Sequence, residues 1–81
     1  MINEKYSYKD FTHISFKDLS ADEFNDSEII GSCFYIEAND WVNTFPIDMQ
    51  GVTFHRCNLD NCIIPDGNNI SDDCCHRLVI G

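Results

Sequence analysis

A five-residue sequence repeat, which we call the beat, runs through the C-terminal half of this chain. Residues 52–66 divide into Val-Thr-Phe-His-Arg, Cys-Asn-Leu-Asp-Asn and Cys-Ile-Ile-Pro-Asp, and each block opens with a small apolar residue followed two places later by a large one. Residues 27–36 show the same pattern as Ser-Glu-Ile-Ile-Gly and Ser-Cys-Phe-Tyr-Ile. A period of five belongs neither to a helix nor to a strand. It predicts a coil with four short sides.

The beat places five large residues at the same position of their blocks, and these are Ile29, Phe34, Phe54, Leu59 and Ile64. The resemblance of the blocks to a known repeat family implies that this position points inward. Extended backwards, the beat gives Ile14, Leu19 and Phe24 the same role. That extension places Lys17 and Asp22 at the small inward position, where an unpaired charge costs several kcal/mol.

These blocks resemble the pentapeptide-repeat family, and Cys57-Asn58-Leu59-Asp60-Asn61 is close to its consensus of a small residue, Asp or Asn, Leu or Phe, and two variable residues. The resemblance implies a right-handed quadrilateral β-helix whose first and third block residues point inward. The expected fold is therefore mainly β with a short helix (α+β), a small truncated right-handed pentapeptide-repeat-like β-helix formed by residues 1–81 as one domain.

Three segments interrupt the beat. Ser20-Ala21-Asp22-Glu23 has the form of a capping box and favours a short helix at 21–26 over another β side, because a helix takes Asp22 out of the core. Residues 37–48 carry no repeat and contain Pro46, which bars a helix. Residues 65–69 have strong turn chemistry and are expected to end the coil. The apolar run 78–80 is expected to cover the open end or to form an interface.

The five cysteines, an odd number, occur in a chain whose first residues lack the apolar run of a secretory signal. Both observations favour reduced thiols in a cytoplasmic protein. Cys57 and Cys62 are five residues apart and could be combined with Cys74, Cys75 and His76 into a metal site, but zinc ligands come in pairs two to four residues apart. We interpret Cys57 and Cys62 as small inward residues and expect no metal or cofactor.

No motif indicates an enzyme. The three histidines, His13, His55 and His76, lack a neighbouring nucleophile and an orienting partner in the sequence. The glycines form no phosphate-binding pattern. Asp22, Asp26 and Glu28 lack the glycine and the bidentate glutamate spacing of a calcium loop.

Acidic charge is the remaining functional signal. The chain has 14 acidic residues against 5 lysines and arginines, a formal net charge of −9. Such a charge disfavours direct binding to nucleic acid or to an anionic membrane. The acids concentrate in residues 1–50. The expected partner-binding residues are Asp10, Asp18, Asp22, Glu23, Asp26 and Glu28, with Glu37, Asp40, Trp41 and Asp48 from the segment without repeat.

A narrow rod coated with carboxylates presents a field similar to that of DNA, and the pentapeptide-repeat family includes DNA mimics. The chain also resembles small acidic phage inhibitors of restriction and CRISPR systems. The resemblance implies an anti-CRISPR protein of the host bacterial cytoplasm, monomeric or weakly dimeric, that occupies a basic DNA-binding surface, with the type I surveillance complex Cascade as the suspected partner.

Two other interpretations stay open at this stage. The charge can serve solubility alone. The chain can also be a non-enzymatic phage interaction or virion module anchored by the aromatics Trp41 and Phe45. These two side chains could equally pack under the coil. Salt separates the classes, because binding through carboxylates weakens steeply as salt rises while an aromatic anchor responds little.

Overall fold

The computed structural model describes residues 1–12, 14–35 and 43–77, and in this part the chain is mainly β with almost no helix. His13, Glu37, Asp40, Trp41 and the apolar run 78–80 lie outside the described residues. The 3₁₀ turn η1 covers Ala21–Glu23. The strands are β1 (Glu28–Ile30), β2 (Asn43–Thr44), β3 (Thr53–His55), β4 (Cys62–Ile63) and β5 (Asn69–Ile70).

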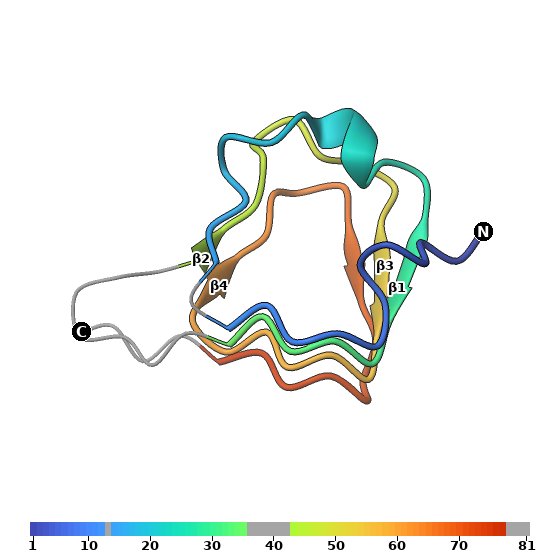
Figure 1. Ribbon diagram of the computed structural model, residues 1–81, viewed down its shortest axis with the longest axis vertical. Coiled ribbons are helices and arrows are strands. Elements are labelled where there is room, and N and C mark those ends of the chain that lie inside the picture. The colour runs from blue at the N-terminus through green and yellow to red at the C-terminus, as the bar shows by residue number, and fades with distance from the viewer. Residues whose placement is uncertain (13, 36–42, 78–81) are drawn as a thin grey trace.

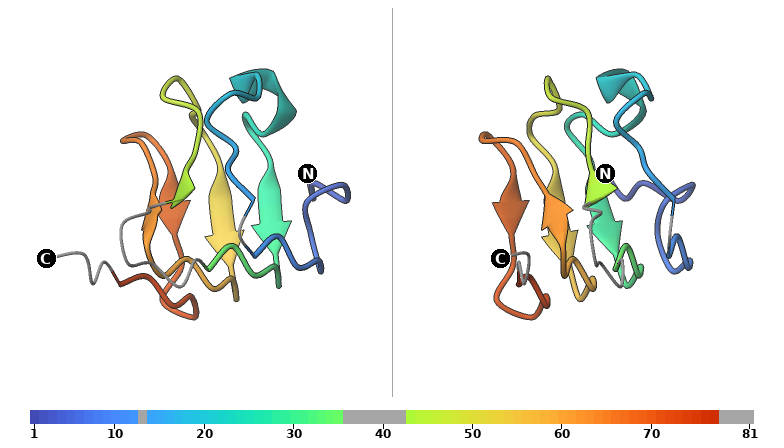
Figure 2. Two further views of the ribbon diagram at one scale, coloured as in Figure 1. Left: turned by 60° about the vertical axis from the view of Figure 1, so that its left-hand side comes forward. Right: turned by 90° about the vertical axis from the view of Figure 1, so that its left-hand side faces the viewer.

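All the strand pairs are parallel. One sheet has the order β1-β3-β5 and the other contains β2 and β4. Isolated parallel bridges align Asp10, Cys33, Asn58 and Cys75 in the same way. Seen down its shortest axis, the chain follows a four-sided outline again and again (Figure 1). In the side views the successive passes lie in layers, with the first residues toward one end of the stack and residues 69–77 toward the other (Figure 2).

The core is a set of stacked side chains inside this outline. Register places Ile29 against Phe54 and Phe54 against Ile70 on the side formed by β1, β3 and β5. On the next side the rings of Phe11 and Phe34 stack at 5.3 Å between centroids. The fully buried large side chains include Phe24, Ile29, Phe34, Phe45, Met49, Phe54 and Leu59. The predicted interior of the repeat is therefore confirmed for Ile29, Phe34, Phe54 and Leu59, while Ile64 is partly buried against this cluster.

Small residues of the beat connect one pass of the chain to the pass before it. The Ser32 hydroxyl donates to the carbonyl of Tyr6. One pass later the Cys57 thiol reaches the carbonyl of Ile29 at 3.4 Å, and on the last pass the Cys74 thiol reaches the carbonyl of Phe54 at 3.3 Å. The Cys62 thiol likewise reaches the carbonyl of Phe34 at 3.3 Å. Thus the inward small residue both fits beside the core and satisfies a polar backbone atom.

Left-handed residues shape the corners. Asp26, Gly51 and Gly67 have φ of 58°, 71° and 93° and lie at corresponding positions two residues before β1, β3 and β5. At a second corner, φ is 59° at Tyr8, 66° at Gly31 and 51° at Arg56. A Cβ on Gly51 would clash with the carboxylate of Asp26 on the preceding pass unless that side chain moved aside, and the φ of 71° also favours glycine in the middle layer.

The N-terminal part corrects the backward extension of the beat. Ile14 and Leu19 are exposed, at 47% and 38%, whereas Phe24 is fully buried. Tyr6 and Phe16, at 4% and 3% exposure, fill the interior with half-buried Phe11. These three aromatics are also five residues apart, but in another phase. In this phase the aromatic rings fill the interior, and the charges of Lys17 and Asp22 stay in solvent, which avoids the cost of burying them.

The alternative in which Phe45 packs under the coil is confirmed, because Phe45 is fully buried, and β2 of the same segment pairs with β4. Two further predictions need correction. The turn at 65–69 does not end the winding, since β5 pairs with β3. At η1 the Ser20 hydroxyl accepts the amide of Asp22 at 3.3 Å, not that of Glu23. The carboxylate of Glu23 pairs with Lys5 instead of reaching back, so the predicted helix is one 3₁₀ turn without a capping box.

Candidate functional site: an acidic side of the stack

One side of the outline gathers carboxylates from three successive passes of the chain. It consists of residues 18–26 before β1, residues 46–51 before β3 and residues 64–68 before β5 (upper side in Figure 1). These segments contain no lysine or arginine. We call this surface the acidic side; its carboxylates belong to Asp18, Asp22, Glu23, Asp26, Asp48 and Asp66, and all six residues are exposed.

Backbone bonds hold the three segments in register. The amide of Asp26 donates to the carbonyl of Gln50 at 3.1 Å, and the amide of Gly51 donates to the carbonyl of Gly67 at 2.9 Å. Parallel neighbours of this kind lie about 4.8 Å apart. The carboxylates of the acidic side are therefore carried on layers with a fixed spacing along the axis of the stack.

Uncharged amides, not carboxylates, make the side-chain links between these layers. The Asn25 carbonyl oxygen accepts the backbone amide of Gln50 at 2.8 Å. The Asn68 oxygen accepts the amide of Val52 at 3.1 Å, and its nitrogen donates to the carbonyl of Met49 at 3.1 Å. This division of roles leaves the acids available: a partner could bind them without first breaking the bonds that hold the fold.

The acids of this side differ in their pairing. Glu23 accepts from Lys5 at 3.0 Å, and this bond raises the pKa of Lys5. Both groups are well exposed, so the pair contributes little to stability. Within the described residues, the carboxylates of Asp22, Asp48 and Asp66 make no hydrogen bond or ion pair. They are consequently the most readily available charges on this side.

Structure and sequence agree on part of the expected set. Asp18, Asp22, Glu23, Asp26 and Asp48 are brought together. Asp10 is not among them, because its segment runs along the opposite side of the outline and its carboxylate accepts the amide and hydroxyl of Thr12. Glu28 lies in β1, on a neighbouring side. Glu37, Asp40 and Trp41 fall outside the described residues. Phe45, the second expected aromatic anchor, is fully buried and cannot be a surface contact.

Asp66 is a member that the sequence prediction missed. It was assigned to the less acidic C-terminal half because charge was compared by position along the chain. The available signal was the repeat itself. Pro65-Asp66-Gly67 follows β4 as Pro46-Ile47-Asp48 follows β2, so an alignment of the two turns would have placed both aspartates on one surface.

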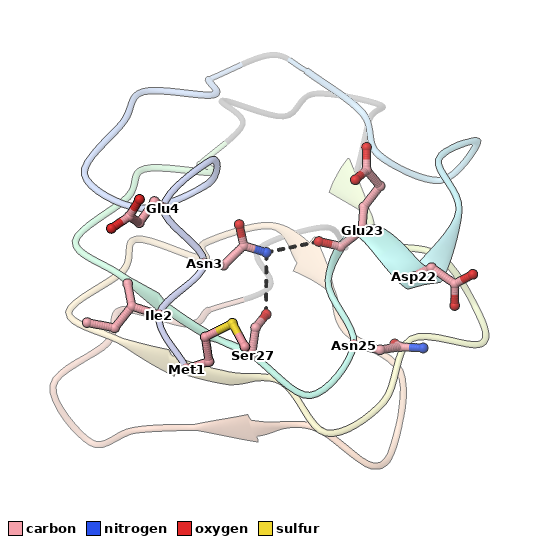
Figure 3. A pocket seen from close by; sticks show the side chains of 8 residues that line it. All are labelled: Met1, Ile2, Asn3, Glu4, Asp22, Glu23, Asn25 and Ser27. Atoms are coloured by element: carbon pink, nitrogen blue, oxygen red, sulfur yellow. Dashed lines mark hydrogen bonds between the residues drawn. The ribbon is translucent and has the colours of Figure 1, made fainter.

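A hollow of about 490 Å³ adjoins the acidic side at the N-terminal end of the stack. Its lining includes Asp22, Glu23, Asn25 and residues 1–4 (Figure 3). The Asn3 amide donates to the carbonyl of Glu23 at 2.9 Å and to the hydroxyl of Ser27 at 3.3 Å. The first residues are thus tied to the acidic side and add the exposed carboxylate of Glu4 near its edge.

Cysteine and histidine chemistry lies away from the acidic side. All five cysteines are free. Burial raises the pKa of Cys57 to about 11 and that of Cys62 to about 12, which makes both thiols weak nucleophiles. The His76 ring contacts the carbonyl of Cys62 at 3.3 Å. Within residues 1–12, 14–35 and 43–77, no group of three or more His, Cys, Asp or Glu side chains is arranged to hold a metal ion.

Comparison of the chain with protein-family models, with curated proteins and with solved structures gives no match. In the described part of the chain, no helix has the length and hydropathy needed to span a bilayer. The function is therefore argued from the acidic side itself.

Proposed function

We propose that this protein is an anti-CRISPR-type inhibitor that mimics DNA. In this proposal the acidic side occupies a basic DNA-binding surface of a bacterial defence complex, with the type I surveillance complex Cascade as the target. One observation carries the proposal: six exposed carboxylates stand on three successive layers with no lysine or arginine in the same segments.

The density of charge supports the mimicry. Three layers with a spacing of about 4.8 Å span roughly 10 Å along the axis. B-form DNA carries one negative charge per about 1.7 Å, hence about six charges over the same length. The acidic side also carries six, of which Glu23 is paired with Lys5; four belong to the first layer and one to each of the next two. A groove of lysines and arginines would meet a comparable field and lose a comparable number of counterions.

A rigid frame for these charges is the second part of the proposal. We infer that the chain forms a short right-handed β-helix of the pentapeptide-repeat type. The parallel registers, the inward first and third block residues and the left-handed corners support this inference. A frame of this kind avoids the entropy that flexible carboxylates lose when they are ordered against a partner.

A competition experiment tests the proposal. Purified Cascade is incubated with the protein, target DNA is added, and bound DNA is measured by mobility shift. We expect wild type to exclude DNA and the charge-reversed pair Asp22→Lys with Asp48→Lys to fail. Asp26 is left unchanged, because its left-handed conformation and the bond from its amide to the carbonyl of Gln50 give it a structural role.

The matched control is Asp72→Lys, set against the single variant Asp48→Lys; it changes the net charge equally on an exposed residue outside the acidic side. Asp73 is unsuitable for this control, because its carboxylate accepts the amide of Arg56 at 3.0 Å. The control variant should still exclude DNA. Simultaneous binding of DNA and wild-type protein to Cascade would disprove mimicry of this target.

A further inference from the structure

An exposed isoleucine stands in the middle layer of the acidic side. Ile47 is 90% exposed, although its neighbour Pro46 is less than 2% exposed and nearby Met49 is 1% exposed. The amide of Met49 donates to the carbonyl of Pro46 at 3.0 Å and closes a turn around Ile47. The backbone on both sides of Ile47 is thus fixed by buried residues while its side chain remains in water.

Charge surrounds this apolar tip. Asp48 follows it directly, the segment of Asp22 and Asp26 lies on the preceding layer, and the segment of Asp66 lies on the next one, as the bonds from Asp26 to Gln50 and from Gly51 to Gly67 require. In protein–protein complexes, the residues that contribute most of the binding energy are often buried at the centre of the interface, inside a rim of contacts that exclude water.

We propose that Ile47 is the apolar anchor of the acidic side and that its partner is a protein surface with an apolar depression bordered by lysines and arginines. This inference rests on the proposed function and deepens it. The carboxylates around Ile47 require basic residues at the border of the partner site, and the exposed Ile47 on its rigid turn requires an apolar depression at the centre. A surface that recognises DNA alone has no use for an isoleucine, so the anchor distinguishes this protein from DNA at the same groove.

The two kinds of contact respond differently to salt. Carboxylate contacts weaken as salt rises, because ions screen them and counterions are no longer released favourably. Burial of an isoleucine does not depend on salt in this way. Loss of most of its side chain should therefore weaken binding by a constant factor at every salt concentration, about 10- to 100-fold for a fully buried side chain.

The experiment measures the affinity of purified Cascade for wild type, for Ile47→Ser and for Ile63→Ser between low and high salt. Ile63 is 43% exposed on β4, outside the acidic side, and serves as the matched control. We expect Ile47→Ser to lower the affinity by the same factor throughout, with the salt slope unchanged, and Ile63→Ser to bind like wild type. Asp22→Lys with Asp48→Lys should instead flatten the salt slope.

The outcomes separate the two proposals. Binding of Ile47→Ser with wild-type affinity would overturn the anchor and leave the acidic DNA mimic intact. Equal losses in Ile47→Ser and Ile63→Ser would also overturn it, since the effect would not belong to the acidic side. Failure of wild type to bind Cascade at low salt would overturn the proposed function and, with it, the anchor. Circular dichroism on each variant verifies that the fold is retained.

Discussion

The two ends of the core are filled by different chemistry. Toward the N-terminus the interior is aromatic: Phe34 lies 5.3 Å from Phe11, 5.6 Å from Phe16 and 5.2 Å from Phe45 between ring centroids. The ring of Tyr6 closes this end at 4.6 Å from Phe24. Toward the C-terminus the stack of rings ends at Phe54, 5.5 Å from Phe45 between ring centroids, and beyond it Ile64, Ile70 and Cys74 remain partly exposed.

The comparison shows two ways of occupying one cross-section. Rings fill it by volume and tolerate irregular loops, so the N-terminal passes need no strict repeat. The later passes keep the five-residue beat, in which the small residues Val52, Cys57 and Cys62 alternate with the large residues Phe54, Leu59 and Ile64. We expect the aromatic end to carry most of the stability, because large buried side chains remove more apolar area from water.

The largest effect is expected from Phe34→Ala. This substitution removes the ring at the centre of the aromatic end and should lower the free energy of unfolding by about 3–5 kcal/mol. A loss of that size approaches the whole stability of a small domain. Ile70→Ala at the open end should cost about 1–2 kcal/mol, because Ile70 is only partly buried. Urea unfolding measures both, and a larger loss in Ile70→Ala would reverse the comparison.

The corners offer a second contrast. Gly51 and Gly67 occupy equivalent corners, at φ of 71° and 93°, but a Cβ on Gly51 would clash with Asp26, whereas a Cβ on Gly67 would meet only Gln50 Cβ at 3.8 Å. Gly67→Ala should cost about 1–2 kcal/mol for its left-handed backbone. Gly51→Ala should cost about 1 kcal/mol more for the clash.

Thermal unfolding of the two glycine variants compares these costs. Asp26→Gly combined with Gly51→Ala should recover the part that is due to the clash, because it removes the carboxylate and relaxes the backbone of residue 26. Identical losses in the two single variants would show that the Asp26 carboxylate moves aside and that the clash adds no cost.

The thiols of the C-terminal end make stability depend on pH. Burial raises the pKa of Cys57 from 9.0 to about 11 and that of Cys62 from 9.0 to about 12. Above pH 9 the unfolded chain releases these protons while the folded chain retains them, so stability should fall from pH 9 until the folded pKa values are reached. The steepest loss is about 1.4 kcal/mol per pH unit for each thiol.

The check is urea unfolding between pH 8 and 11 for wild type and for Cys57→Ser with Cys62→Ser. The double variant should lose much of the alkaline slope. A slope that persists undiminished would show that other groups, and not these thiols, are responsible.

The smallest effect is expected from Cys57→Ser. Register aligns Cys57 with Ser32, and both side chains donate to a carbonyl of the preceding pass. Serine should keep this bond and change stability by less than about 1 kcal/mol, while Cys57→Ala loses it and should cost about 1–2 kcal/mol. Calorimetry of both variants tests the order. If alanine is tolerated better than serine, the position is purely apolar.

Sequence reasoning was most successful where the core is regular. The beat predicted the burial of Phe54 and Leu59, because a small residue followed by a large one fixes which side chains point inward. It failed near the N-terminus, where rings such as Tyr6 and Phe16 fill space without a repeated small neighbour. At Phe45 it left burial and surface contact open, since no pattern along residues 37–48 reveals that β2 pairs with a strand later in the chain.

The sequence predicted that a surface of this protein is acidic, but not which residues belong to that surface. Charge counting found Asp22, Asp26 and Asp48, yet it also included Asp10 and omitted Asp66. Membership depends on which segments stack, and stacking depends on strand register, which a charge count along the chain does not contain. Ile47 was missed for a related reason: its exposure follows from the buried Pro46 and Met49 on either side of its turn.

Carboxylate footprinting tests the central claim most directly. Exposed acids of the free protein and of its complex with Cascade are labelled with a carbodiimide and an amine, and the modified residues are read by mass spectrometry. We expect Asp22, Asp48 and Asp66 to be protected in the complex, and Asp72 to be labelled equally in both states. Protection of Asp72 with full labelling of Asp22, Asp48 and Asp66 would contradict the account, because the bound surface would then lie elsewhere on the molecule.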